Sequence, residues 1–170
     1  MSARGQLVGM PRLALAVGLI GLLGCSGMAE GLVELFTGAD IEHEGDEVVV
    51  TNADGSTQRI TQGEGTALPE GFPLPVPPAG TLDSVVRSEG GSNNSIVVSF
   101  RLEDDADIEP IVAFYDQWFA DQGIAVESET KNMAGMRTTA MAATKNGEVY
   151  AVTLTDALGT RMLMLSHTPR

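Results

Sequence analysis

Acidic side chains gather most densely between residues 103 and 109, in the sequence Glu-Asp-Asp-Ala-Asp-Ile-Glu. Several carboxylates this close together are the ligands that Ca²⁺ prefers. The run lacks the spacing and the glycine of an EF-hand loop, and it also suits a turn that leads into a helix. We favour the turn, and a calcium site is the alternative.

Soft metal ligands gather later in the chain, where methionines precede the second of two histidines. Thioether and imidazole groups suit copper, which makes these residues a candidate copper site. Methionine also fills irregular hydrophobic cores, and this is the interpretation that we favour. The residues concerned are Met133, Met136, Met141, Met162, Met164 and His167.

Residues for catalysis are few. Only His43 and His167 could act as a general base near neutral pH. His43 lies between Glu42 and Glu44, but in a strand its side chain would point away from both. The sequence contains no GxSxG, GxxxxGK[ST], HExxH or CxxC motif. We therefore predict no catalytic residue, no cofactor, no metal ligand set and no enzymatic activity, and we rank an unfamiliar carboxylate enzyme last.

The single cysteine, Cys25, follows an uncharged apolar run from Leu13 to Gly24 that is preceded by Arg4 and Arg12. This run is short for a membrane span, which needs about 20 residues, and is typical of a signal peptide. The residues Leu22-Leu23-Gly24-Cys25 resemble the lipobox of bacterial lipoproteins. The resemblance implies cleavage after residue 24 and attachment of lipid to Cys25; an uncleaved membrane anchor is the alternative.

The expected location follows from the same resemblance. Residue 26 is Ser rather than Asp, which by similarity to enterobacterial sorting favours the outer membrane, facing the periplasm, over the inner membrane. Residues 1–24 hold two arginines and no acid, so the net charge of −13 becomes −15 in residues 25–170. This charge argues against nucleic acid as a partner and leaves attachment to the lipid.

One amphipathic helix is expected from about Ile108 to Gln122. Asp107 suits the N-cap, Pro110 is tolerated in the first turn, and Gly123 suits the residue that ends the helix. Half of the chain's aromatic residues share one face of this helix at helical spacing, which predicts that the face packs against a sheet. They are Phe114, Tyr115, Trp118 and Phe119.

Strands are expected before and after this helix. Residues 40–62 predict a small hairpin module with an Asp54-Gly55 turn, and Asn146-Gly147 predicts a second hairpin. Alternating apolar residues predict further strands. Their expected ranges are 81–89, 96–102, 124–129, 137–145, 148–155 and 161–167.

Prolines separate the hairpin from the rest, because residues 66–80 hold five of the eight in the chain. We predict an extended connector anchored by Phe72; a recognition peptide around Pro75–Pro78 is the alternative. The predicted domains are a signal peptide (1–24), a tether and hairpin module (25–65), the connector (66–80) and an α+β domain (81–170). The fold class is α+β: an antiparallel sheet with one amphipathic helix packed on a face, preceded by a small β-hairpin module.

The order of motifs resembles bacterial envelope lipoproteins without an assigned function. The matching residues are Leu68-Pro69-x-x-Phe72-Pro73, Pro77-Pro78-x-Gly80 and Phe114-Tyr115-x-x-Trp118-x-x-x-Gln122-Gly123. We therefore expect a lipid-anchored, non-catalytic binding or assembly accessory whose partners are the membrane, through Cys25, and a second envelope protein. Residues 161–166 are expected to form a contact with the hairpin module or with that partner. The alternative function is a small-ligand or metal-binding (Ca or Cu) periplasmic lipoprotein.

Overall fold

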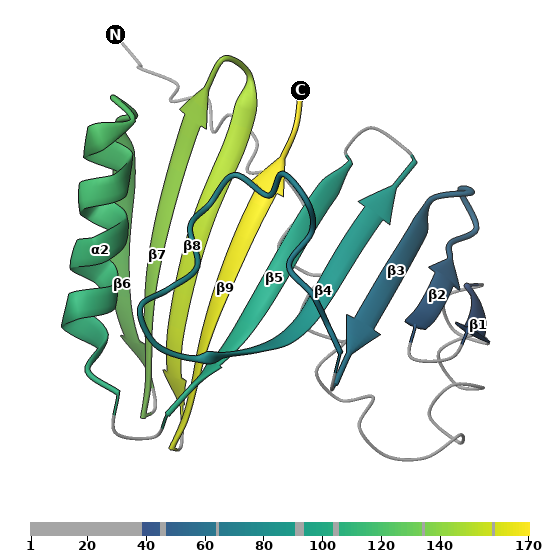
Figure 1. The fold of residues 1–170 in the computed structure, drawn as a ribbon, viewed down its shortest axis with the longest axis horizontal. Helices are drawn as coiled ribbons and strands as arrows, with labels where there is room; N and C mark the ends of the chain where they lie inside the picture. The colour runs from purple at the N-terminus through teal and green to yellow at the C-terminus, as the bar shows by residue number, and fades with distance from the viewer. Residues whose placement is uncertain are drawn as a thin grey trace, which may run out of the picture. The chain divides into compact units, whose positions relative to one another are not determined.

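The computed structural model describes residues 39–44, 47–63, 65–90, 94–103, 106–133, 135–157 and 159–170. Within these residues nine strands form one antiparallel sheet in the order β1-β2-β3-β4-β5-β9-β8-β7-β6 (Figure 1). The strands are β1 (Asp40–Glu44), β2 (Glu47–Thr51), β3 (Thr57–Gln62), β4 (Thr81–Glu89), β5 (Ser95–Leu102), β6 (Val126–Met133), β7 (Met136–Lys145), β8 (Glu148–Ala157) and β9 (Thr160–Thr168). One helix, α2 (Ile108–Asp121), is present in the same residues.

The expected fold class, α+β, is wrong, because the described part of the chain is mostly β, with one short helix beside nine strands. The separate hairpin module is wrong as well. β3 pairs with β4 along its whole length, from Thr57 opposite Glu89 to Gln62 opposite Ser84. The outer edge of β4 has N–H and C=O groups that need partners, and β3 supplies them. The hairpin therefore extends the sheet instead of standing apart from it.

Local turn chemistry is as the sequence predicts. Asn146 and Gly147, which connect β7 to β8, have φ values of 56° and 87°, as a tight hairpin turn requires. The Asp54 side chain accepts hydrogen bonds from the backbone N–H and the hydroxyl of Ser56, which closes the turn between β2 and β3. Residues 45 and 46, between β1 and β2, lie outside the described residues.

Helix α2 begins and ends where the sequence indicates. The Asp107 carboxylate accepts a hydrogen bond from the Glu109 N–H and caps the N-terminus, and Gly123 after the helix has a φ of 65°. The buried residues of the helix belong to one hydrophobic core together with side chains of β4, β5, β7, β8 and β9. They are Ile108, Ile111, Tyr115 and Phe119.

The proline-rich connector lies over the same face of the sheet as the core. It forms neither helix nor strand, as predicted, and crosses in front of β9 and β8 in Figure 1. Leu74 is buried in the core, Phe72 packs against it, and the Pro75 carbonyl accepts a hydrogen bond from the Tyr115 hydroxyl at 3.0 Å. The connector therefore acts as a second cover for the core beside the helix.

Strand alternation divides the sheet into two different faces. One face carries the core, with Val98, Leu163 and Leu165 completely buried. The other, which we call the outer face, carries the alternate residues of the same strands, such as Val149 and Met164, which are exposed or half-buried. An antiparallel sheet commonly has one packed face and one more exposed face, and this sheet follows that pattern.

Candidate functional site

Three side chains of different chemistry meet where β8 and β9 lie side by side. Glu148 and Tyr150 are two residues apart on β8 and therefore share a face, and Tyr150 lies opposite His167 of β9. The Tyr150 hydroxyl donates a hydrogen bond to Glu148 Oε2, and His167 Nε2 lies 3.7 Å from the same oxygen. We call these three residues the Glu148 cluster.

The Glu148 cluster is buried at its base and open at its carboxylate. The Tyr150 and His167 rings lie 5.1 Å apart, and Trp118 of α2 lies 6.4 Å from Tyr150. The Glu148 side chain is 39% exposed, whereas the His167 side chain is 13% exposed. His167 Nε2 is itself buried and has no hydrogen-bond partner, an arrangement that generally costs about 1–3 kcal/mol.

The hydrogen bond to Glu148 changes the acidity of Tyr150. The carboxylate stabilises the protonated phenol and, together with burial, raises the pKa of Tyr150 to about 12. At neutral pH the phenol therefore keeps its proton and donates it in the hydrogen bond to Glu148. The cluster thus combines a carboxylate, a phenol and an imidazole around a single oxygen atom.

A second polar cluster lies where α2 begins. Arg137 pairs with Glu109 at 2.9 Å, and Arg161 pairs with Asp156 at 3.1 Å while donating to the Ala106 carbonyl at 2.8 Å. The hydrogen bond from Arg137 holds the pKa of Glu109 below its usual value. These groups line a cavity of about 410 Å³. The charged groups pair with each other. The Arg137–Glu109 ion pair and the hydrogen bond from Arg161 to the Ala106 carbonyl attach the start of the helix to the sheet.

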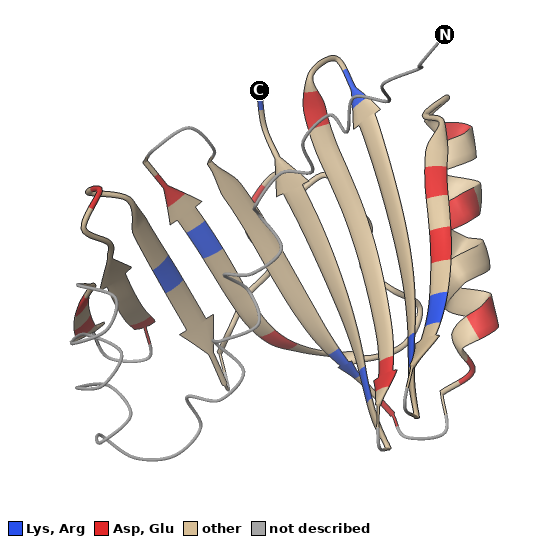
Figure 2. Ribbon diagram, turned by 180° about the vertical axis from the view of Figure 1, so that it is seen from behind, with Lys and Arg blue, Asp and Glu red and all other residues tan. Residues whose placement is uncertain are grey.

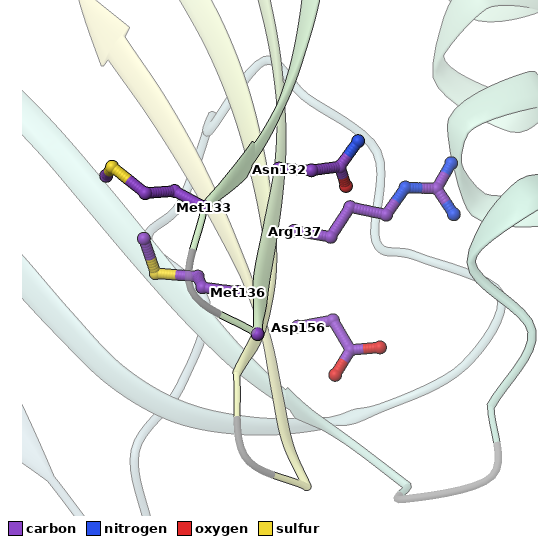
Figure 3. Close-up of a pocket in the computed structure, with 6 residues that line it drawn as sticks. Asn132, Met133, Met136, Arg137 and Asp156 are labelled. Atoms are coloured by element: carbon purple, nitrogen blue, oxygen red, sulfur yellow. The ribbon is translucent and has the colours of Figure 1, made fainter.

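A second recess, of about 340 Å³, lies at the tip of the β6–β7 hairpin. Met133 and Met136 face each other across the hairpin and are 67% and 37% exposed. In Figure 3 both methionines project to one side, whereas Asn132, Arg137 and Asp156 project to the other. The polar and sulfur-containing groups therefore do not converge on one point in this recess.

The acidic run at 103–109 serves the helix start in the described residues. Asp107 caps α2 and Glu109 pairs with Arg137, whereas Asp104 and Asp105 lie outside the described residues. His43 is exposed on β1 opposite Val48, so strand alternation separates it from the face that Glu42 occupies. As far as the structure describes them, neither feature provides a set of converging ligands.

The methionines and His167 are not brought together as one copper site. Met141 is buried in the core, whereas Met162 and Met164 point to the outer face and are half-buried. His167 lies on the core face and contacts Tyr150 instead. The prediction that these methionines pack in the core is therefore confirmed for Met141 and not for Met162 and Met164.

The expected contact between residues 161–166 and the hairpin module has no place in this sheet. β9 pairs with β5 and β8, and β4 and β5 separate it from β3. The hairpin strands are joined to the sheet edge to edge and do not lie over β9. A contact of these residues with a second protein stays a prediction.

Comparisons with known proteins add no identity. No family model matches the chain, and no curated protein or solved structure matches it. Cys25 and the lipobox-like residues lie outside the described part of the chain. Among the described residues, no helix is long and apolar enough to cross a membrane, and no three His, Cys, Asp or Glu side chains gather around a metal position.

The Glu148 cluster is the feature that the sequence analysis missed. The sequence indicates His167 as a possible general base and, with the methionines, as a possible copper ligand, but not as a neighbour of Tyr150. The pairing of β8 with β9 brings the two together, and that register cannot be read from composition. The available signal was the Glu-Val-Tyr segment directly after the Asn146-Gly147 turn, since alternation places Glu148 and Tyr150 on one face. The residue opposite Tyr150 follows only from the length of the next hairpin.

Proposed function

We propose that this protein is a lipid-anchored component of the bacterial cell envelope that acts as a non-catalytic binding or assembly accessory. The observation that carries the proposal is the sequence Leu22-Leu23-Gly24-Cys25 directly after a short apolar run. Two or more acyl chains on Cys25 would hold the acidic body at a membrane without help from charge. Ser26 favours the outer membrane, on the periplasmic side.

The outer face of the sheet supports a role in binding a second envelope protein. Figure 2 shows that charged residues on β5, β9, β8 and β7 stand toward the strand ends and leave the middle uncharged. The middle of the outer face carries small, hydroxyl and methionine side chains, among them Ala140, Ala151, Thr153, Met162 and Met164. Such a surface suits close contact with a protein, because little charge has to be desolvated.

Mass spectrometry of the protein extracted from bacterial membranes with detergent tests the anchor. We expect the mass of residues 25–170 plus acyl chains, with the lipid on the Cys25 peptide. A chain that keeps residues 1–24 and carries no acyl group would contradict the proposal and favour the uncleaved anchor.

A charge placed on the outer face tests the binding role. Chemical cross-linking in intact cells should give a discrete adduct, and Met164→Glu should abolish it. Ala113→Glu adds the same charge at an exposed position of α2 and serves as the matched control. An adduct that survives Met164→Glu would show that residues 161–166 do not form the contact.

A second candidate function is a metal-binding envelope lipoprotein. It is favoured by the Glu148 cluster, and not by the acidic run at 103–109 or the methionines, for which metal binding was the alternative interpretation.

A further inference from the structure

We propose that Glu148, Tyr150 and His167 bind a first-row transition-metal ion that accepts nitrogen and oxygen ligands, such as Cu²⁺ or Zn²⁺. The inference deepens the metal-binding candidate function and does not depend on the lipid anchor. Imidazole and oxygen ligands suit both ions.

Two of the three donor atoms stand at a separation that a metal ion can bridge without movement. Glu148 Oε2 is the common point, because Tyr150 donates its hydroxyl proton to it and His167 Nε2 lies 3.7 Å away. Metal–ligand bonds to nitrogen and carboxylate oxygen are about 2.0–2.2 Å, so two ligands of one ion stand at most about 4.2 Å apart. The 3.7 Å separation lies within that span. Tyr150 and Glu148 stand at hydrogen-bond distance, so the Tyr150 oxygen would have to turn away from Glu148 to bind the same ion, because metal–oxygen bonds are longer than O–H bonds.

The unpartnered nitrogen of His167 is the independent sign of a ligand. This nitrogen is buried and neither donates nor accepts a hydrogen bond. It lies on the side of the ring that faces the Glu148 carboxylate. Buried polar atoms without partners are rare in native proteins and call for an explanation, such as an ion that the protein binds. A neutral imidazole uses this nitrogen to bind a metal.

The neighbours of the Glu148 cluster are apolar on one side, and two cationic side chains lie near its carboxylate end. The neighbour of His167 on β5 is Ile96, which is apolar, and α2 contributes Trp118. Lys145 lies opposite Glu148 on β7, but its ammonium donates to the Gln122 carbonyl at 2.8 Å. The Arg170 side chain lies over Gly147 in the adjacent turn. A divalent ion would therefore be neutralised by Glu148 and the Tyr150 phenolate.

Metal binding at this site requires the loss of one proton. The O–H bond of Tyr150 breaks, the phenolate oxygen bonds to the metal, and the proton passes to solvent. Glu148 binds through Oε2 and His167 through Nε2. Because one proton is released, affinity should rise with pH. The partly exposed Glu148 carboxylate gives the ion a path from solvent, and water fills the remaining coordination positions.

Titration of the full chain in detergent with Cu²⁺ tests the proposal, with Cys25 alkylated in every sample. We expect one bound Cu²⁺, a visible phenolate-to-copper absorption band, and a nitrogen coupling in the electron paramagnetic resonance spectrum. Tyr150→Phe should remove the absorption band, and His167→Gln should remove the nitrogen coupling. Each should weaken binding by about tenfold or more.

The second histidine provides the matched control. His43→Gln removes the other imidazole of the chain, on β1, and should leave the band and the affinity unchanged. Glu148→Gln, which keeps the size of a partly exposed side chain, should also weaken binding and covers the case in which a ring variant does not fold.

Other outcomes would overturn the proposal. They are the absence of a phenolate band, binding that Glu148→Gln and His167→Gln leave unchanged, or binding lost instead in His43→Gln or in a Met133→Leu, Met136→Leu double variant. Because acylation has no part in this titration, its failure would leave the lipid-anchor proposal standing.

Discussion

The two ends of the strand order bury their hydrophobic residues in different ways. In β7, β8 and β9, buried residues alternate with exposed or half-buried ones along most of each strand. In β2 and β3 only Val49 and Ile60 are buried, and neither belongs to the core formed with α2 and the connector. The difference shows that helix and connector organise the core around the second half of the sheet. The first strands lie outside this core and join the sheet through β3, which pairs with β4.

The largest expected effect comes from replacing one isoleucine in each region by alanine and comparing the losses in the free energy of unfolding. Ile111 is 1% exposed in the core and Ile60 is 4% exposed outside it. Ile111→Ala should lower the free energy of unfolding by about 4 kcal/mol, and Ile60→Ala by about 2 kcal/mol. Urea denaturation monitored by Trp118 fluorescence measures both. Equal losses would contradict the division into a core region and a pairing region.

The tyrosines of the core region should make the fold sensitive to alkali. The hydrogen bond to Glu148 and burial raise the pKa of Tyr150 from 10.0 to about 12, and burial also raises the pKa of Tyr115. A raised pKa of an acid stabilises the fold below the unfolded value, and this stability is lost as pH rises from about 10 to about 12. Urea midpoints across this range should therefore fall in the wild type.

Tyr150→Phe isolates the contribution of one tyrosine to this pH dependence. The variant should lose less stability between pH 10 and 12 than the wild type, and ultraviolet titration should show Tyr150 ionising before Tyr115. A Tyr150 that titrates near pH 10 in the folded protein would contradict the hydrogen bond to Glu148.

The cap of α2 should have a smaller effect. Asp107 accepts the Glu109 N–H at 3.3 Å, so Asp107→Ala should cost about 1 kcal/mol. Asp116→Ala, an exposed position later in the helix, is the control and should change stability by less than about 0.5 kcal/mol. Equal effects of the two substitutions on the urea midpoint would show that the cap contributes nothing specific.

The ion pair between Arg137 and Glu109 should have the smallest effect. Both side chains are substantially exposed, at 43% and 65%, so the pair should contribute at most about 1 kcal/mol. A double-mutant cycle of Arg137→Met and Glu109→Gln measures this coupling, which should shrink further in high salt. A larger, salt-independent coupling would mean that the start of α2 is more tightly held than its exposure indicates.

Local features of this fold could be predicted from the sequence, and long-range pairings could not. The cap at Asp107, the glycine after α2, the Asn146-Gly147 turn and the absence of helix or strand at 66–80 follow from short-range chemistry. The pairing of β3 with β4 crosses the proline-rich connector, which resembles a domain boundary in composition. The local pattern therefore gave a wrong fold class although most strands were placed correctly.

The same limit applies to the Glu148 cluster. His167 lies 17 positions from Tyr150 and 19 from Glu148, and only the register of the β8–β9 hairpin places His167 beside Tyr150. Side chains that contact each other across strands cannot be recognised from composition or from a short motif. A cluster of this kind is visible only after the strand pairing is known.

The lipid anchor is the claim on which the proposed function depends, and one substitution tests it directly. Cys25→Ser removes the only sulfur to which a diacylglyceryl group could be attached in the lipobox-like segment. In bacterial cells the wild type should sediment with membranes and carry labelled fatty acid, whereas the variant should carry no label and leave the membrane fraction after detergent-free washing, provided that its leader is removed. A variant that has lost its leader and still stays in washed membranes to the same extent as the wild type, with or without label, would contradict the account.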